Sequence, residues 1–142
     1  MIIKSVHGER TLVFREYDGE YVVVACGDGD VHARRRVYLY TDGPAIAALF
    51  RDIAEHWRGW DGEKDFESVE GDFSLEATAD HLGHIALRVS LRHHDPRDAW
   101  SVALPIWLEA GSLDDIAGAM ERYFASSARG EGPRGDPGKL QR

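Results

Sequence analysis

The chain has 142 residues and a net charge of −8, with 43% hydrophobic and 30% charged residues. These totals are typical of one globular domain with a single core, and no run approaches the roughly 18 apolar residues of a membrane helix. The negative charge repels phosphate backbones, so we expect no nucleic-acid partner, and the lack of a long apolar run leads us to expect no membrane partner. The opening stretch MIIKSVHGER lacks the apolar region of a secretory signal, which favours a cytoplasmic protein.

Strands are predicted along most of residues 11–40. The segments TLVFREY, EYVVVAC and VHARRRVYLY are rich in β-branched and aromatic residues, and turn signals separate them at Asp18-Gly19 and Gly27-Asp28-Gly29. This order predicts a small antiparallel meander. The segment IIKSV is a candidate edge strand before it.

Cys26, the only cysteine, lies where the second of these strands meets a turn. A single cysteine excludes an internal disulfide and a multi-cysteine zinc site. No neighbouring motif supplies the base that a thiolate nucleophile needs, so we interpret Cys26 as a small buried residue.

A helical period replaces the strand pattern near residue 41. Asp42 is a candidate N-cap, Pro44 suits the first turn, and Gly59 is a plausible end of the helix. The predicted buried stripe consists of Ile46, Leu49, Phe50, Ile53 and Trp57. The next segment, WDGEKDFESVEGD, has no clear period, and we interpret it as an acidic connection.

Alternating apolar residues predict three further strands, over residues 73–77, 85–91 and 100–108. The third contains Pro105, which cannot donate a backbone hydrogen bond. This proline indicates an edge strand or a bulge at its position.

A second helix is predicted over residues 111–124, where Ser112 and Asp115 resemble a capping box. Its predicted buried residues are Leu113, Ile116, Ala117, Met120 and Phe124. The remaining segment is rich in Gly, Pro and charge, so we expect a flexible tail over residues 127–142. The predicted fold over residues 1–126 is α+β, with an antiparallel β-sheet of about six to seven strands and two packed helices.

Four histidines surround one predicted strand, at positions 81, 84, 93 and 94. The two pairs lie at opposite ends of a strand, roughly 25 to 30 Å apart, so they cannot share one coordination sphere. We interpret them as polar turn residues, with Gly83 supplying the backbone freedom for a tight connection, and predict no metal and no cofactor.

None of the common catalytic motifs occurs in the sequence, and we predict no catalytic residues. The remaining combination for acid–base chemistry is Glu76, His84 and Arg88, provided that strand register brings them together. In HARRRVY, Arg34 and Arg36 share one strand face and Arg35 lies on the other. We expect these arginines to form cross-strand ion pairs with acidic neighbours rather than a nucleic-acid platform.

The four tryptophans divide into two groups. Trp57 and Trp100 have the spacing of core residues, whereas Trp60 follows the predicted helix end and Trp107 points away from the buried strand face. Exposed aromatic residues among carboxylates are typical of a protein-binding patch, and packing beneath the tail or the first strands is the alternative. The predicted patch consists of Trp60, Asp61, Glu63, Trp107 and Glu109.

The stretches GDFSLEATADHLGHIALRVSLR and DAWSVALPIWLEAGSLDDIAGAMERYF resemble a group of small uncharacterised actinobacterial proteins. They are more distantly similar to the WapI-type immunity proteins of bacterial polymorphic-toxin systems. The resemblance covers residues 71–124 and carries no catalytic residues. The second similarity implies a non-enzymatic, cytoplasmic inhibitor that binds one cognate toxin.

We therefore predict an acidic protein-binding domain, immunity-like, whose partner is a basic toxin domain and which is itself a monomer or a homodimer. One alternative is a homo-oligomeric domain that associates through exposed edge strands. Another is a metal-dependent enzyme centred on His84.

Overall fold

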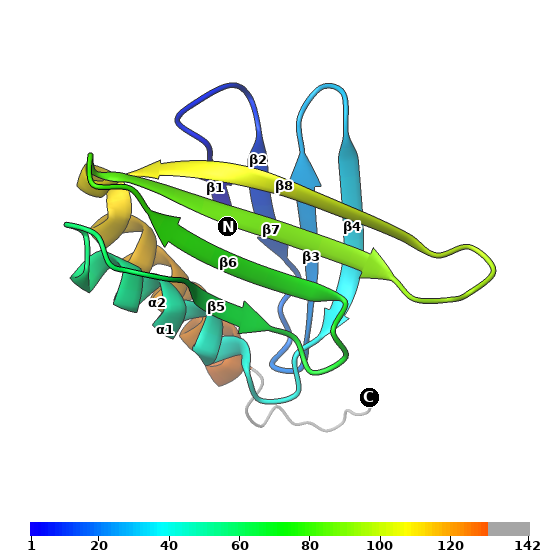
Figure 1. Ribbon diagram of the computed structural model, residues 1–142. Coiled ribbons are helices and arrows are strands. Elements are labelled where there is room, and N and C mark those ends of the chain that lie inside the picture. Colours follow the sequence, from blue (N-terminus) through cyan, green and yellow to red (C-terminus); the bar gives the residue numbers. More distant parts are fainter. Residues whose placement is uncertain (131–142) are drawn as a thin grey trace.

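The computed structural model describes the backbone of residues 1–130 and the side chains of residues 1–125. This part of the chain forms two four-stranded antiparallel sheets and two α-helices (Figure 1). The first sheet has the order β1-β2-β3-β4: β1 (Ile2–Lys4), β2 (Thr11–Arg15), β3 (Tyr21–Gly27) and β4 (His32–Tyr38). The second has the order β5-β6-β7-β8: β5 (Lys64–Glu67), β6 (Phe73–Ala79), β7 (His84–His93) and β8 (Trp100–Glu109). The helices are α1 (Gly43–Glu55), the short 3₁₀ helix η1 (Ala110–Ser112) and α2 (Leu113–Gly130).

One hydrophobic core joins both sheets and both helices. The ring of Phe14 on β2 packs edge-on against Phe73 on β6, with centroids 6.0 Å apart, and against Phe124 on α2, at 5.8 Å. All three side chains are fully buried. In Figure 1 the second sheet crosses in front of the first, and the helix pair lies beside the first sheet behind β5 and β6.

The prediction of α+β class is confirmed, but the prediction of one sheet with six to seven strands is wrong. The extra strand is β5, which lies inside the segment predicted to be an acidic connection and carries a single buried residue, Phe66. Four residues are too few to give a detectable alternation. The strands form two sheets, since β4 and β5, which are separated by α1 in the chain, are both edge strands and do not pair with each other.

Helix α1 is shorter than its sequence pattern suggests. It ends at Glu55, and His56 caps it by donating its backbone N–H to the carbonyl groups of Asp52 and Ile53. Trp57 therefore lies beyond the helix and is 48% exposed, so its predicted core position is wrong. Asp42 occupies the N-cap position, but its side chain forms no capping hydrogen bond.

The start of α2 also differs from the prediction. The Ser112 hydroxyl donates to the Glu109 carbonyl oxygen, in a 3₁₀ turn before the helix, and does not form the expected capping box with Asp115. Helix α2 continues to Gly130, so the first residues of the expected tail are helical. The rest of that expected tail lies outside the described residues.

Strand β8 is an edge strand, as Pro105 indicated. The loop between β1 and β2 covers part of this edge, because the Trp107 backbone N–H donates to the Ser5 hydroxyl and the Trp107 carbonyl accepts from the Val6 N–H. The Arg10 guanidinium donates to the Pro105 carbonyl oxygen. These contacts bind the two sheets together and satisfy backbone groups that an edge strand otherwise leaves open.

A search of the described helices finds none with the length and apolar character needed to cross a membrane.

The aromatic cluster predicts the effect of a core substitution. Phe14→Ala removes a fully buried ring that touches both the opposite sheet and α2, and it should lower the free energy of unfolding by about 3–5 kcal/mol. Denaturant titration followed by tryptophan fluorescence measures this change. Tyr40→Ala, at an exposed position, should stay within about 0.5 kcal/mol of the wild type. Equal effects of the two substitutions would contradict the shared core.

Candidate protein-binding site

Three chain connections gather at one end of the second sheet, at the left of Figure 1: residues 56–63, the β6–β7 turn at residues 80–83, and residues 109–112. We call this region the acidic end. The register places the turn beside the end of β8, because His84 pairs with Glu109. The exposed carboxylates at this end belong to Asp61, Glu63, Asp80 and Glu109.

Hydrogen bonds to the Asp80 side chain define the β6–β7 turn at the acidic end. The Asp80 carboxylate accepts hydrogen bonds from the backbone N–H groups of Leu82 and His84, at 2.8 and 3.0 Å. The two backbone bonds hold the pKa of Asp80 below its usual value, so the group stays charged at neutral pH. Gly83 adopts a φ of +87°, which confirms the expectation that it permits a tight turn.

Two apolar side chains project from this end. Leu82, inside the turn, is 80% exposed, and Trp57, after α1, is 48% exposed with the Arg58 guanidinium stacked on its ring. A hollow of about 290 Å³ lies beside Trp57. It is lined by Ala54, Trp57, Ala110, Gly111, Leu113 and Asp114. Exposed apolar groups beside a hollow and surrounded by charge have the arrangement of a binding hot spot with a polar rim.

The structure brings four of the five predicted patch residues to the acidic end. Asp61 and Glu63 are exposed in the connection after α1, and Glu109 is exposed at the end of β8. Trp60 is also there, but it is half-buried against the core, beneath the Lys64 ammonium, with its indole N–H buried and unpaired. Trp107 lies apart: it is half-buried on the outer face of β8, and the His7 ring packs edge-on against it.

The exposed residues that sequence reasoning missed are therefore Trp57 and Leu82. Trp57 continues the helical spacing of the buried stripe, and only the end of α1 at Glu55 takes it out of the core. A signal for Leu82 was present, because a large apolar residue in a predicted tight turn has no strand or helix face on which to be buried. Trp100 was likewise expected in the core, and it is 37% exposed where it stacks on His93.

The residues considered for acid–base chemistry come together only in part. Glu76 and Arg88 are cross-strand partners, with side-chain atoms 4.0 Å apart, on the outer face of the second sheet. His84 lies four residues from Arg88 along β7, about 13 Å away, and pairs with Asp80 instead. This geometry leaves Glu76 and Arg88 as a surface ion pair with no histidine beside them.

The expectation of cross-strand ion pairs between the three arginines and acidic neighbours is met only in part. Arg35 and Arg36 have acidic partners, but neither partner stands opposite them on β3, and Arg34 forms no ion pair within the described side chains. Ala25, Val24 and Val23 stand opposite Arg34, Arg35 and Arg36 on β3. Arg35 points into the space between the sheets and pairs with Asp72 of the second sheet, at 3.3 Å. The contact of Arg36 with Asp18 is long, at 3.9 Å, and both groups are exposed.

Asp72 and Arg35 form a polar contact between the two sheets. The Asp72 side chain is 3% exposed, and its second oxygen accepts a hydrogen bond from the buried Ser68 hydroxyl at 2.8 Å. The Arg35 guanidinium also contacts His93 Nδ1 at 2.6 Å. Removal of either charged group would leave the other partly buried without its main partner.

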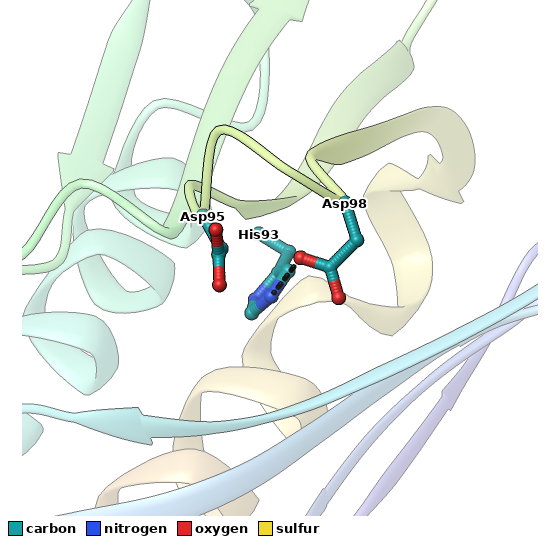
Figure 2. Close-up of side chains that lie close together, drawn as sticks. All are labelled: His93, Asp95 and Asp98. Atoms are coloured by element: carbon teal, nitrogen blue, oxygen red, sulfur yellow. Dashed lines mark ion pairs between the residues drawn. The ribbon is translucent and has the colours of Figure 1, made fainter.

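A histidine and two carboxylates meet at the other end of the second sheet, in the β7–β8 hairpin (Figure 2). His93, Asp95 and Asp98 each offer a ligand atom within 4.8 Å of the others, and His93 Nε2 lies 3.2 Å from Asp98. Arginine can only donate, so Nδ1 of His93 accepts from Arg35 and Nε2 carries the ring proton. A metal at Nε2 would have to displace that proton and the contact with Arg35, so these residues fit a hydrogen-bond network better than a metal site.

A hollow of about 760 Å³ lies between α1 and α2. Arg51 crosses it and donates to Asp114 and Glu121 at 2.6 to 3.0 Å. These hydrogen bonds raise the pKa of Arg51, and the contact with Arg51 lowers the pKa of Glu121. The Arg51 guanidinium in this hollow is thus already paired with two carboxylates.

Comparison with known proteins places the chain in a family. A model described as "Family of unknown function (DUF6228)" matches residues 7–127, and the chain belongs to that family. No curated protein and no solved structure matches it. The family description names no activity.

Cys26 provides a prediction about reactivity. It is 1% exposed, and burial raises its pKa to about 11, as expected for a structural cysteine. A thiol reagent such as Ellman's reagent should react slowly with the folded protein at pH 8 and modify one thiol on denaturation. The thiol of the unfolded chain ionises at about pH 8.5, below the pKa in the folded state. The free energy of unfolding should therefore fall as the pH rises from there towards 11. Rapid labelling of the folded protein would contradict a buried role.

The contact between Arg35 and Asp72 gives a second prediction. Arg35→Leu leaves the buried Asp72 carboxylate without its cation and should cost about 2–3 kcal/mol of unfolding free energy, since Arg35 itself is partly exposed. Adding Asp72→Asn to this variant removes the uncompensated charge and should restore part of the loss. Denaturant titration of the two variants tests this predicted order of stability. A double variant less stable than Arg35→Leu would contradict the pairing.

Proposed function

We propose that this protein is a non-enzymatic protein-binding domain, and that its acidic end binds a basic surface of a partner protein. The observation that carries the proposal is the exposure of Trp57 and Leu82 at one end of a rigid sheet, beside an apolar hollow and among carboxylates. Folding alone gives no reason to expose these two large side chains together, whereas a binding partner could bury both.

The charge of the acidic end supports a basic partner. Asp61, Glu63 and Glu109 are exposed and form no ion pair with any residue of the described chain. Asp80 is ionised at neutral pH, as an aspartate ordinarily is, and the backbone hydrogen bonds that lower its pKa favour the charged form further. Carboxylates around an apolar centre steer a basic surface into contact, and the desolvated aromatic and aliphatic groups then supply most of the affinity.

The narrower form of the proposal is an immunity-like inhibitor that acts in the cytoplasm on a basic toxin domain. Its support is the resemblance described from the sequence, together with the acidic binding surface. An inhibitor of this kind needs only to cover its target and requires no catalytic groups. The candidate catalytic groups do not come together in the described residues, because Cys26 is buried and His84 lies away from Glu76 and Arg88.

The test is capture of partners from a lysate of the source organism, followed by affinity measurement for any protein retained. Trp57→Ala combined with Leu82→Ser should weaken binding of the cognate partner by about 2 kcal/mol or more, close to thirtyfold. Added salt should weaken the interaction with the wild type.

A control replaces two exposed apolar residues elsewhere, Tyr40→Ala combined with Val69→Ser, which are 57% and 58% exposed. This variant should bind the partner as the wild type does. If the Trp57 and Leu82 variant keeps its affinity for the partner, or if both variants lose the same affinity, the partner binds another surface. Trp60→Ala is a poorer test because Trp60 packs against the core and its loss would disturb folding.

A further inference from the structure

The outward face of the first sheet has a charge opposite to that of the whole protein. The chain contains 25 acidic residues, yet no Asp or Glu occurs in β1, β2, β3 or β4. Lys4, Arg15, Arg34 and Arg36 are exposed on this face. We call these four residues the basic face.

Most of these charges lack compensation. Within residues 1–125, Lys4, Arg15 and Arg34 form no ion pair, and Arg36 has only the distant contact with Asp18. Arg36 lies over the Tyr21 ring, 3.8 Å from its centroid. Val23 on β3 stands opposite both Arg15 and Arg36 and is only 4% exposed, so this part of the face offers cations rather than apolar surface. The basic face is therefore a set of exposed cations over a covered apolar residue.

The basic face is continuous with an open sheet edge. Strand β4 pairs only with β3, and its seven residues present their other edge to no strand of the described chain. Such an edge offers unpaired backbone N–H and C=O groups to an added strand. Edge strands also carry charge to prevent indiscriminate pairing, and arginines on β4 would select against basic and apolar strands.

We propose that β4 accepts an extended acidic segment of a partner protein, which adds to the first sheet as a further strand. Arg34 and Arg36 project from the same face two residues apart, which is about 6.6–6.8 Å along a strand. Acidic side chains at alternate positions of an added strand have this same spacing, so two carboxylates would face two guanidinium groups. The two surfaces then differ in partner chemistry: the acidic end binds a basic surface, and β4 binds an acidic strand.

A strand fits these features better than a polyanion such as nucleic acid. A nucleic acid would extend past the basic face over a molecule of net charge −8, where repulsion increases with length. A short strand gains backbone hydrogen bonds at the edge of β4 and needs only local charge complementarity.

The experiment uses the full chain and a fluorescent synthetic peptide of eight residues in which Glu and Thr alternate. We expect binding at low salt, measured by anisotropy, and at least about tenfold weaker binding when Arg34→Glu and Arg36→Glu are combined. The control combines Arg88→Glu with Arg97→Glu, which changes the net charge equally at exposed arginines of the second sheet and its hairpin. This control should bind within about twofold of the wild type.

A second peptide has the same sequence with every backbone amide nitrogen methylated, which retains the charge but removes the donors that an added strand needs. It should bind much more weakly, and equal binding of the two peptides would overturn strand addition. An oligothymidylate that binds more tightly than the Glu-Thr peptide would instead make the basic face a nucleic-acid surface. Failure of the peptide to bind at low salt would overturn the proposal, as would self-association of the wild type that is lost in the Arg34 and Arg36 variant.

Discussion

The contact of Phe14 with Phe73 and Phe124 is the constraint on which the rest of the structure depends. It joins a strand of each sheet and the last helix in one buried cluster, so the inner face of each sheet must be apolar. The opposite face of each sheet is then left towards solvent. Both candidate surfaces follow from this arrangement, because one uses the open face of the first sheet and the other uses the chain connections at the end of the second.

The polar contact between Arg35 and Asp72 acts beside this core and explains why three consecutive arginines on β4 have different roles. Alternation along the strand directs Arg35 inward, where Asp72 neutralises it, and directs its two neighbours outward. The inward arginine also ties β4 to the β7 end through His93. The protein as a whole is acidic, but the fold separates its charge into an acidic end and a basic face, and each can steer a partner of opposite sign.

The candidate site could be predicted in its chemistry but not in its exact members. Local composition indicated Asp61, Glu63 and Glu109 as exposed acidic residues near an aromatic patch, and the structure places these three at one end of the second sheet. Periodicity assigned Trp57 to the core and Trp60 to the surface, whereas α1 stops before Trp57 and the chain turns Trp60 back against the core. Helix ends are decided by capping and tertiary packing, and the helical period of the sequence does not report on either.

Local sequence patterns were enough to predict the α+β class, most of the strands, both helices and the burial of Cys26, and they narrowed the place of Pro105 to an edge strand or a bulge. These properties follow from local period, turn residues and the missing N–H of proline. The division of the strands into two sheets, the contact of Arg35 with Asp72 and the choice of exposed apolar residues depend on tertiary contacts. Strand pairing and the contact of one sheet with another join residues far apart in the chain, and a local pattern carries no information about which distant partner it will meet.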